Sequence, residues 1–439
     1  MPHFLRKRVE GRAAFQKIID NAGWLFFDKV LRMGVGLVVN IWVVRYLGPE
    51  RFGLLSYSIA FAALFATFAT LGLDGIVIRE LVRKPDDYRE ILGSALVLRL
   101  VGGISALLCC IVFFVVLRKS DSQGVMLIAI IAAGMVFQAF DVIDFWFQSQ
   151  MQSRYTVLAK NSAFLVAAGM KIGLILAHAS LLLFAWAALL EIILGAIGML
   201  LFYNKSGFRM HEWRNTFARC RCMLSDSWPM ILSGLSIAIY MKIDQIMLGD
   251  MAGNGAVGIY TSATKLSEIW YMIPMIIVSS VFPTIVKSKV QDEQLYLRRI
   301  TRLFSLMAGV SLLIAIPMSL CSSWVVTALY GNAYQAAGPV LAVHIWASLF
   351  VFYGVAQGPW DLTENLTRLA MVRIVTGATV NILLNLWLIP MYGPIGAAVA
   401  TVASQALAAV FLNLLHEKTR PIFYCQIKSL LFVRYLRGL

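Results

Sequence analysis

Twelve long apolar runs, separated by short polar segments, occupy most of this 439-residue chain. A helix needs about 20 apolar residues to cross the hydrocarbon core of a bilayer, and each run is long enough. Hydrophobic residues make up 60% of the chain and charged residues 14%, whereas soluble domains have roughly 45–50% and 25%. We therefore expect an all-α polytopic membrane protein with about 12 transmembrane helices. The predicted spans are 22–44, 53–73, 91–117, 124–147, 157–177, 181–203, 226–248, 255–285, 303–325, 339–360, 369–389 and 393–415.

The basic residues indicate how the chain is oriented. An even number of spans places both termini on one side, and most basic residues of the predicted loops lie on that side. The loops of the opposite side contain only Arg45, Arg51, Arg118 and Lys119. Because cytoplasmic loops are enriched in Lys and Arg, we expect both termini to be cytoplasmic and the protein to lie in the cytoplasmic (inner) membrane. The same bias accounts for the net charge of +15 without a nucleic-acid partner.

The six cysteines do not form a recognisable framework or metal site. Cys109 and Cys110 are adjacent inside an apolar run, and Cys220 and Cys222 are spaced too closely for a zinc knuckle. We expect reduced thiols and no metal. Since no nucleotide-binding loop occurs, we expect no cofactor and no ATP hydrolysis, and coupling to an H⁺ or Na⁺ gradient stays open.

The chain divides into two halves that resemble one another. A basic linker at 204–225 separates a six-helix lobe at 1–203 from a second lobe at 226–415, and a basic cytoplasmic tail follows at 416–439. Spans one and seven both end in Leu-Gly, and the next spans begin with Phe52-Gly53-Leu54 and Val257-Gly258-Ile259, which are equivalent positions. Six spans per half predict a parallel repeat, which is typical of transporters with a central substrate site. We expect two pseudo-symmetric six-helix bundles around a central cavity.

Charged residues deep inside a span are costly and are often functional. Arg32 lies ten residues into the first span, roughly 15 Å deep at 1.5 Å per residue. Lys29 lies one turn away on the same face, and Asp28 is placed at i,i+4 to Arg32. We interpret Arg32 as a cationic cavity residue and Lys29 as a weaker candidate. A purely structural pair of Asp28 and Arg32 is the alternative.

Spans seven and eight contain a second group of charges. Lys265 lies about ten residues into span eight, and Glu268 at i+3 is its candidate partner. Lys242 and Asp244 lie near the outer end of span seven on different faces. Asp244 has no cation on its own face, which makes it a candidate ion or proton site.

Four further positions are better explained by helix pairing or anchoring. Glu191 has no local partner, and Lys171 in the preceding span is its expected counter-charge. Arg99 and Arg373 lie near the cytoplasmic ends of their spans, where long side chains reach the interface.

Two polar stripes also occur. Asp141 and Asp144 form one near the cytoplasmic mouth of span four, where it would line the cavity entrance or anchor the helix. Asn381 and Asn385 belong to a stripe that we interpret as helix packing.

The deep charges taken together are cationic. Lys29, Arg32, Lys242 and Lys265 lie inside spans, and the outer loop adds Arg45 and Arg51. Arg forms bidentate contacts with phosphate and Lys supplies a point charge. The residues predict an exporter or flippase for a large anionic substrate.

Several tracts resemble a known superfamily. RYLGPERFGLLSYSIAFAALFATFATLGLDGIVIRELVR (45–83), KIDQIMLGDMAGNGAVGIYTSATKLSEIWYMIP (242–274), ALYGNAYQAAGPVLAVHIWASLF (328–350) and NILLNLWLIPMYGPIGAAVATVASQ (381–405) occur in order. They resemble the polysaccharide-type flippases of the multidrug/oligosaccharidyl-lipid/polysaccharide (MOP) exporter superfamily. The peptidoglycan-precursor flippases of that superfamily are similar but carry two further helices.

The resemblance implies alternating access and a particular cargo. A polyprenyl-diphosphate-linked oligosaccharide would move from the cytoplasmic to the outer leaflet for cell-surface polysaccharide biosynthesis. The diphosphate would meet the cationic residues named above, and Trp270 and Tyr271 could stack on sugars. Membrane lipids and other polysaccharide-assembly proteins are the implied partners.

Two other classes of membrane protein fit the sequence less well. A cation-coupled multidrug exporter of the same superfamily would use Glu191, Asp244 or Glu268 for cationic drugs, which the basic excess disfavours. An enzyme acting on lipid-linked sugars would need paired catalytic acids or a metal site in a sizeable outer loop. The short outer loops favour a transporter and not an enzyme.

Overall fold

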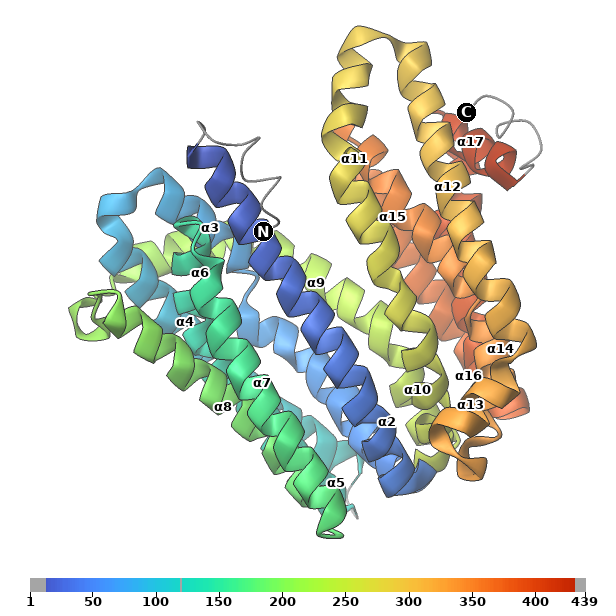
Figure 1. Ribbon diagram of the computed structural model, residues 1–439, viewed down its shortest axis with the longest axis horizontal. Coiled ribbons are helices and arrows are strands. Elements are labelled where there is room, and N and C mark those ends of the chain that lie inside the picture. Colours follow the sequence, from blue (N-terminus) through green and yellow to red (C-terminus); the bar gives the residue numbers. More distant parts are fainter. Residues whose placement is uncertain (1–12, 119–120, 431–439) are drawn as a thin grey trace. The chain divides into compact units, whose positions relative to one another are not determined.

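The chain is helical throughout its described length. The computed structural model describes residues 13–118 and 121–430, and these form helices and short turns without a β-strand (Figure 1). Ten helical segments among these residues are long and apolar enough to cross a membrane. Two of them, Asp20–Arg83 with 64 residues and Thr367–Leu414 with 48, are long enough to cross twice. Eight single and two double crossings give twelve, which confirms the predicted architecture of an all-α membrane protein.

The chain forms two compact units, which are described separately. Unit 1 comprises residues 1–47 and 58–238, and unit 2 comprises residues 48–57 and 239–439, within the described ranges. The predicted linker at 204–225 groups with unit 1, and so do residues 226–238, which the sequence suggested for the second lobe. The physical reason is that a single long helix, α9, begins at Phe217 and continues to Met251, and its first half packs on unit 1.

Unit 1 is built from long antiparallel helices joined by short turns. Its elements are α2 (Ala13–Thr70, apart from residues 48–57), α3 (Asp74–Arg83), η1 (Pro85–Asp87), α4 (Tyr88–Leu117), α5 (Ser122–Phe137), η2 (Gln138–Asp141), α6 (Val142–Ser149), α7 (Ser153–Leu176), α8 (Leu181–Lys205), η3 (Met210–Glu212) and the first half of α9 (Phe217–Met251).

Unit 2 continues from the second half of α9. Its further elements are α10 (Asn254–Glu268), η4 (Ile269–Tyr271), α11 (Met272–Gln291), α12 (Glu293–Leu320), α13 (Ser322–Tyr330), η5 (Asn332–Tyr334), α14 (Ala337–His344), α15 (Ala347–Thr363), α16 (Thr367–Ala409), η6 (Phe411–Leu414) and α17 (Arg420–Leu430). α17 belongs to the predicted basic tail, of which residues 431–439 lie outside the described part.

Two Gly-Pro steps turn the chain between successive crossings. Gly48 has φ 70° and ψ 170° inside α2, and Gly393 has φ 55° and ψ −132° inside α16. Positive φ is readily adopted only by glycine, and the following Pro49 and Pro394 lack the backbone N–H that would continue the helical ladder. Each step therefore divides one long helical segment into two crossings.

Small residues bring helices into close contact, while large apolar residues face outward. Gly103 of α4 packs on the backbone of Met135 in α5, and Gly198 of α8 packs on Ala159 of α7. Leu313 and Leu320 are 75% and 82% exposed. Small residues inside and apolar residues outside are the pattern of helices that pack within a lipid bilayer.

Candidate functional site

Unit 1 contains a chain of alternating charges between three helices. Asp28 and Arg32 lie one turn apart on α2, and Asp28 Oδ1 accepts from Arg32 Nε at 2.8 Å. Arg32 Nη1 lies 3.8 Å from Glu191 Oε1 on α8, and Lys171 Nζ on α7 lies 3.3 Å from Glu191 Oε2. The Arg32 guanidinium also lies over the ring of Phe164, 5.2 Å from its centre. The sequence predicted two separate pairs, Asp28 with Arg32 and Lys171 with Glu191. The structure joins these four residues in one cluster.

A second charged cluster lies beside the first. Lys160 Nζ lies 2.9 Å from Asp141 Oδ1 and 3.1 Å from Asp144 Oδ2. Arg99 forms ion pairs with Asp74 and with Asp141, the latter at 4.0 Å. Lys160 was not among the residues selected from the sequence. Its position near the start of span five, facing the Asp141 and Asp144 stripe, is the signal that could have identified it.

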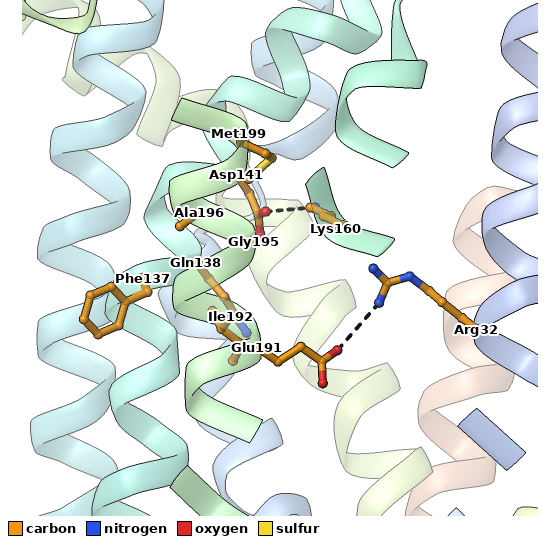
Figure 2. A pocket seen from close by; sticks show the side chains of 10 residues that line it. All are labelled: Arg32, Phe137, Gln138, Asp141, Lys160, Glu191, Ile192, Gly195, Ala196 and Met199. Carbon is orange, nitrogen blue, oxygen red and sulfur yellow. Dashed lines mark ion pairs between the residues drawn. The ribbon is translucent and has the colours of Figure 1, made fainter. Parts of the chain in front are cut away.

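A pocket of about 170 Å³ opens between these clusters. Figure 2 shows Arg32 pointing toward Glu191 and Lys160 pointing toward Asp141. The residues that line the pocket are Arg32, Phe137, Gln138, Asp141, Lys160, Glu191, Ile192, Gly195, Ala196 and Met199. The pocket thus presents two cations and two carboxylates, all from unit 1.

Carboxylates outnumber cations in these two clusters, with five carboxylates (Asp28, Asp74, Asp141, Asp144 and Glu191) to four cations. Each cation of the two clusters, Arg32, Arg99, Lys160 and Lys171, has a carboxylate within 4.0 Å. Cations can be counted along the sequence, but several of the carboxylates that lie beside them come from other helices. The positive surplus expected from the sequence therefore does not extend to Arg32.

Three of the proposed phosphate-binding cations are not neutralised in this way. Lys29 and Arg45 of unit 1 and Arg51 of unit 2 are exposed, and none forms an ion pair with another residue in the described ranges. Their charge is available to a ligand or to lipid headgroups.

Unit 2 contains a buried carboxylate that is held by neutral donors. Asp244 on α9 is 5% exposed. It accepts hydrogen bonds from Tyr260 Oη at 2.7 Å, Thr401 Oγ1 at 2.6 Å and Asn385 Nδ2 at 2.6 Å. Asn385 Nδ2 also donates to Asn381 Oδ1 at 3.1 Å. Within the described residues no cation pairs with Asp244, as the sequence suggested.

Two amide atoms beside Asp244 lack a partner. Asn385 Oδ1 and Asn381 Nδ2 are buried and form no hydrogen bond with the described residues, although leaving such groups unpaired is costly. Carboxylate, amide and hydroxyl oxygens are the ligands that hard cations prefer. The arrangement can therefore hold a small cation, or a proton on the carboxylate. The sequence missed this role for Asn381 and Asn385, because small and amide residues at that spacing are also typical of helix packing.

The remaining unit 2 candidates form a looser group. Lys265 is exposed, and its Nζ lies 5.1 Å from the centre of the Phe52 ring. Lys242 and Lys265 both act electrostatically on Glu268. Both predicted cations thus act on the carboxylate that the sequence paired with Lys265.

A buried ion pair in unit 2 was not predicted. Arg373 Nη2 lies 2.5 Å from Asp361 Oδ2, and Arg373 Nη1 donates to Asn413 Oδ1 at 2.7 Å. Asn413 in turn donates to Gln426 of α17 at 3.3 Å. The expectation that Arg373 reaches the interface is wrong, because the buried carboxylate of Asp361 holds its side chain and Arg373 is only 9% exposed. Arg99 is 3% exposed and pairs with Asp74, whose side chain is 61% exposed.

These features define a helical membrane transporter. Its fold is that of the MOP superfamily. A multidrug resistance MATE family transporter of that superfamily in its inward-facing conformation matches with a TM-score of 0.70 and 14% identity, over 92% of this chain and 96% of that chain. The lipid II flippase MurJ in its inward closed conformation matches with a TM-score of 0.69 and 14% identity, over 96% of this chain and 93% of that chain. At such low identity these matches establish the fold alone.

The chain belongs to the polysaccharide biosynthesis protein family, whose model matches residues 18–289. The probable flippase AglR of Haloferax volcanii is 26% identical over 402 residues, covering 88% of this chain and 80% of that protein. The putative O-antigen transporter of Shigella flexneri is 21% identical, covering 92% of this chain and 99% of that protein. The resemblance to polysaccharide-type flippases is confirmed, and the chain is a transporter of the flippase type and not an enzyme.

Proposed function

We propose that this chain moves a polyprenyl-diphosphate-linked oligosaccharide from the cytoplasmic to the outer leaflet by alternating access, for cell-surface polysaccharide assembly. The observation that carries the proposal is the near full-length similarity to proteins named as flippases and as an O-antigen transporter. The absence of large loops in the described residues supports a transporter that acts without separate catalytic domains.

The diphosphate is met by cations of both units, three of which have no carboxylate partner among the described residues. These three, Lys29, Arg45 and Arg51, are exposed, and Lys242 and Lys265 add positive charge near Glu268. Phosphate exchanges its water for ammonium and guanidinium groups at little cost when these groups are already accessible. Arg32 is a poor phosphate ligand by comparison, because Asp28 and Glu191 already hold it.

The energy source is a cation bound at Asp244. A carboxylate buried in a membrane protein without a counter-ion is expensive, and a proton or Na⁺ would remove that cost. Binding and release of this cation would couple the H⁺ or Na⁺ gradient to the conformation of unit 2. Asn381, Asn385 and Thr401 supply the further oxygens.

We place the chain in the cytoplasmic membrane with both termini in the cytoplasm. The support is the distribution of Lys and Arg over the loops. Membrane lipids surround the protein. Its expected protein partners are polysaccharide-assembly proteins that supply or receive the glycan.

The second candidate is a cation-coupled multidrug exporter, which the MATE-like fold and the carboxylates Glu191, Asp244 and Glu268 favour. In unit 1, however, every carboxylate near the pocket has a basic partner, so little negative charge remains for a cationic drug.

The test is flipping of a lipid-linked oligosaccharide in proteoliposomes, with inorganic pyrophosphate as a competitor. Lys265→Ala and Lys29→Ala should lower the rate several-fold and weaken inhibition by pyrophosphate. Lys289→Ala, which removes a cation from the exposed end of α11, is the control. Unchanged rates and unchanged inhibition in both cavity variants would reject the cationic role while leaving flipping itself intact.

A further inference from the structure

The pocket of unit 1 has an apolar wall on one helix. Ile192, Gly195, Ala196 and Met199 line it from α8, at the i, i+3, i+4 and i+7 positions that share one helical face. Glycine and alanine in the middle of this stripe leave the wall hollow. A Cβ at Gly195 would meet only one atom within 4 Å, the Cβ of Ala163 at 4.0 Å.

Beside this wall, several polar groups keep unused hydrogen-bonding capacity. Arg32 Nη1 and Glu191 Oε1 are 3.8 Å apart, which is too long for a hydrogen bond. Lys160 has three N–H donors, and Asp141 and Asp144 take two of them. The Gln138 side chain lines the pocket and forms no hydrogen bond with any described residue.

The pairing of positive and negative charges in the pocket favours an uncharged ligand with hydroxyl groups. Arg32 and Lys160 are matched by Glu191 and Asp141, so an anion entering the pocket would be repelled by two carboxylates. A hydroxyl both donates and accepts. It can therefore bridge Arg32 and Glu191 without disturbing either charge. The C–H groups of a sugar ring would at the same time contact the apolar wall of α8.

We propose that this pocket is a subsite for one uncharged sugar ring of the transported glycan. Its volume of about 170 Å³ equals that of about six liquid waters, so it accepts a single ring and not the whole oligosaccharide. The inference rests on the proposed function and divides the substrate: sugar hydroxyls meet the paired charges of unit 1, and phosphate meets exposed cations such as Lys29, Arg45 and Arg51. The sites of recognition for the two parts are then chemically different.

The experiment fills the hollow wall without altering a charge. Gly195→Leu introduces a side chain into the pocket, and Gly169→Leu makes the same change on α7, where a Cβ meets nothing within 4 Å. Gln138→Leu removes the free amide as a second, independent variant. The probe is the glycan released by mild acid from the lipid-linked oligosaccharide of the producing organism. Binding to the full-length purified chain is followed by saturation-transfer NMR, with inorganic pyrophosphate as a second probe.

We expect wild type and Gly169→Leu to bind the released glycan alike. Gly195→Leu should weaken glycan binding at least tenfold and Gln138→Leu about fivefold, as for one lost hydrogen bond, while pyrophosphate binding stays unchanged. Wild-type glycan affinity in both pocket variants would overturn the subsite. Loss of pyrophosphate binding with glycan binding retained would also overturn it and would make this a phosphate pocket.

Flipping of the intact lipid-linked oligosaccharide separates the two proposals. A wild-type protein that flips, with Gly195→Leu flipping equally well, rejects the subsite and leaves the proposed function standing. A wild-type protein that neither flips the lipid nor binds the glycan rejects both.

Discussion

Asp361 and Arg373 show what a single buried interaction contributes to unit 2. Both side chains are about 10% exposed and their charged atoms are 2.5 Å apart. Removing one partner leaves the other charge buried and unpaired, which costs about 3–5 kcal/mol.

We predict that Arg373→Gln lowers thermal stability sharply in detergent, measured by the loss of monodisperse protein on heating. The double variant Asp361→Asn with Arg373→Gln should recover much of this loss, because no unpaired charge remains. Lys289→Gln, which breaks one ion pair with the exposed Glu293 and one with the partly buried Glu364, should lose far less stability than Arg373→Gln. A double variant that is less stable than Arg373→Gln would contradict this account.

Asp244 supports a prediction about energy coupling. Asp244→Asn is close in shape and retains hydrogen bonding, so the protein should fold, but it removes the negative charge that binds a cation. We expect transport in proteoliposomes to lose its dependence on the imposed gradient. Measuring the rate against separate Na⁺ and pH gradients identifies the ion. Glu293→Gln, an exposed carboxylate of α12, is the control. A full gradient response in Asp244→Asn would exclude this site.

The sequence identified charges better than it identified their partners. Depth along a span was sufficient to select Arg32, Asp244 and Glu191, because charge in an apolar run is visible in the sequence. Which carboxylate meets which cation depends on the rotation of each helix about its axis. Lys160 and Asp361 were missed for that reason.

At the scale of helices, the backbones of α2 and α10 lie in direct contact where the second crossing begins. Gly53 of α2 and Gly258 of α10, both in unit 2, pack so closely that a Cβ on either would overlap the backbone of the other segment. The sequence already paired these two glycines as equivalent positions of the two halves. Their direct contact could not be inferred, because similarity between halves does not specify which helices touch.

We predict that Gly53→Ala destabilises the protein by about 1–3 kcal/mol, since backbone cannot yield as a side chain does. Gly34→Ala in the same helix meets nothing within 4 Å, and it should be neutral or stabilise the helix by up to about 1 kcal/mol. Thermal melting of the two variants under identical conditions checks this. Equal melting temperatures would contradict the close packing.

The helix ends could be predicted where local chemistry determines them. Gly48-Pro49 and Gly393-Pro394 end one crossing and begin the next, close to the predicted boundaries at 44–53 and 389–393. The border between the units could not be predicted, because α9 is continuous through it. Only tertiary packing assigns its first half to unit 1.

For the whole molecule, the expected orientation makes a labelling prediction. Cys222 at the start of α9 is exposed and should face the cytoplasm, whereas Ala333 in η5 is exposed and should face outward. In a variant whose other cysteines are replaced, a membrane-impermeant maleimide should label Cys222 only after permeabilisation. Ala333→Cys, in a background without Cys222, should be labelled in intact cells. The reverse labelling pattern would contradict the predicted orientation and place the termini on the outer side.

Composition and the lengths of the apolar runs were enough to predict the architecture, since a bilayer sets the length of every crossing. The identity of the glycan is not encoded in such a pattern. In the proposed subsite it would depend on a few side chains around the pocket of unit 1, and their arrangement becomes visible only when helices such as α2, α7 and α8 are brought together.

The most direct test of the account is the leaflet position of a lipid-linked oligosaccharide in proteoliposomes that contain the wild-type chain. The glycan, loaded on the inner leaflet, is detected from outside by a lectin. We predict a time-dependent rise in lectin-accessible glycan that protein-free vesicles lack. No rise above those vesicles, together with efflux of organic cations by the same preparation, would contradict the account and favour a multidrug exporter.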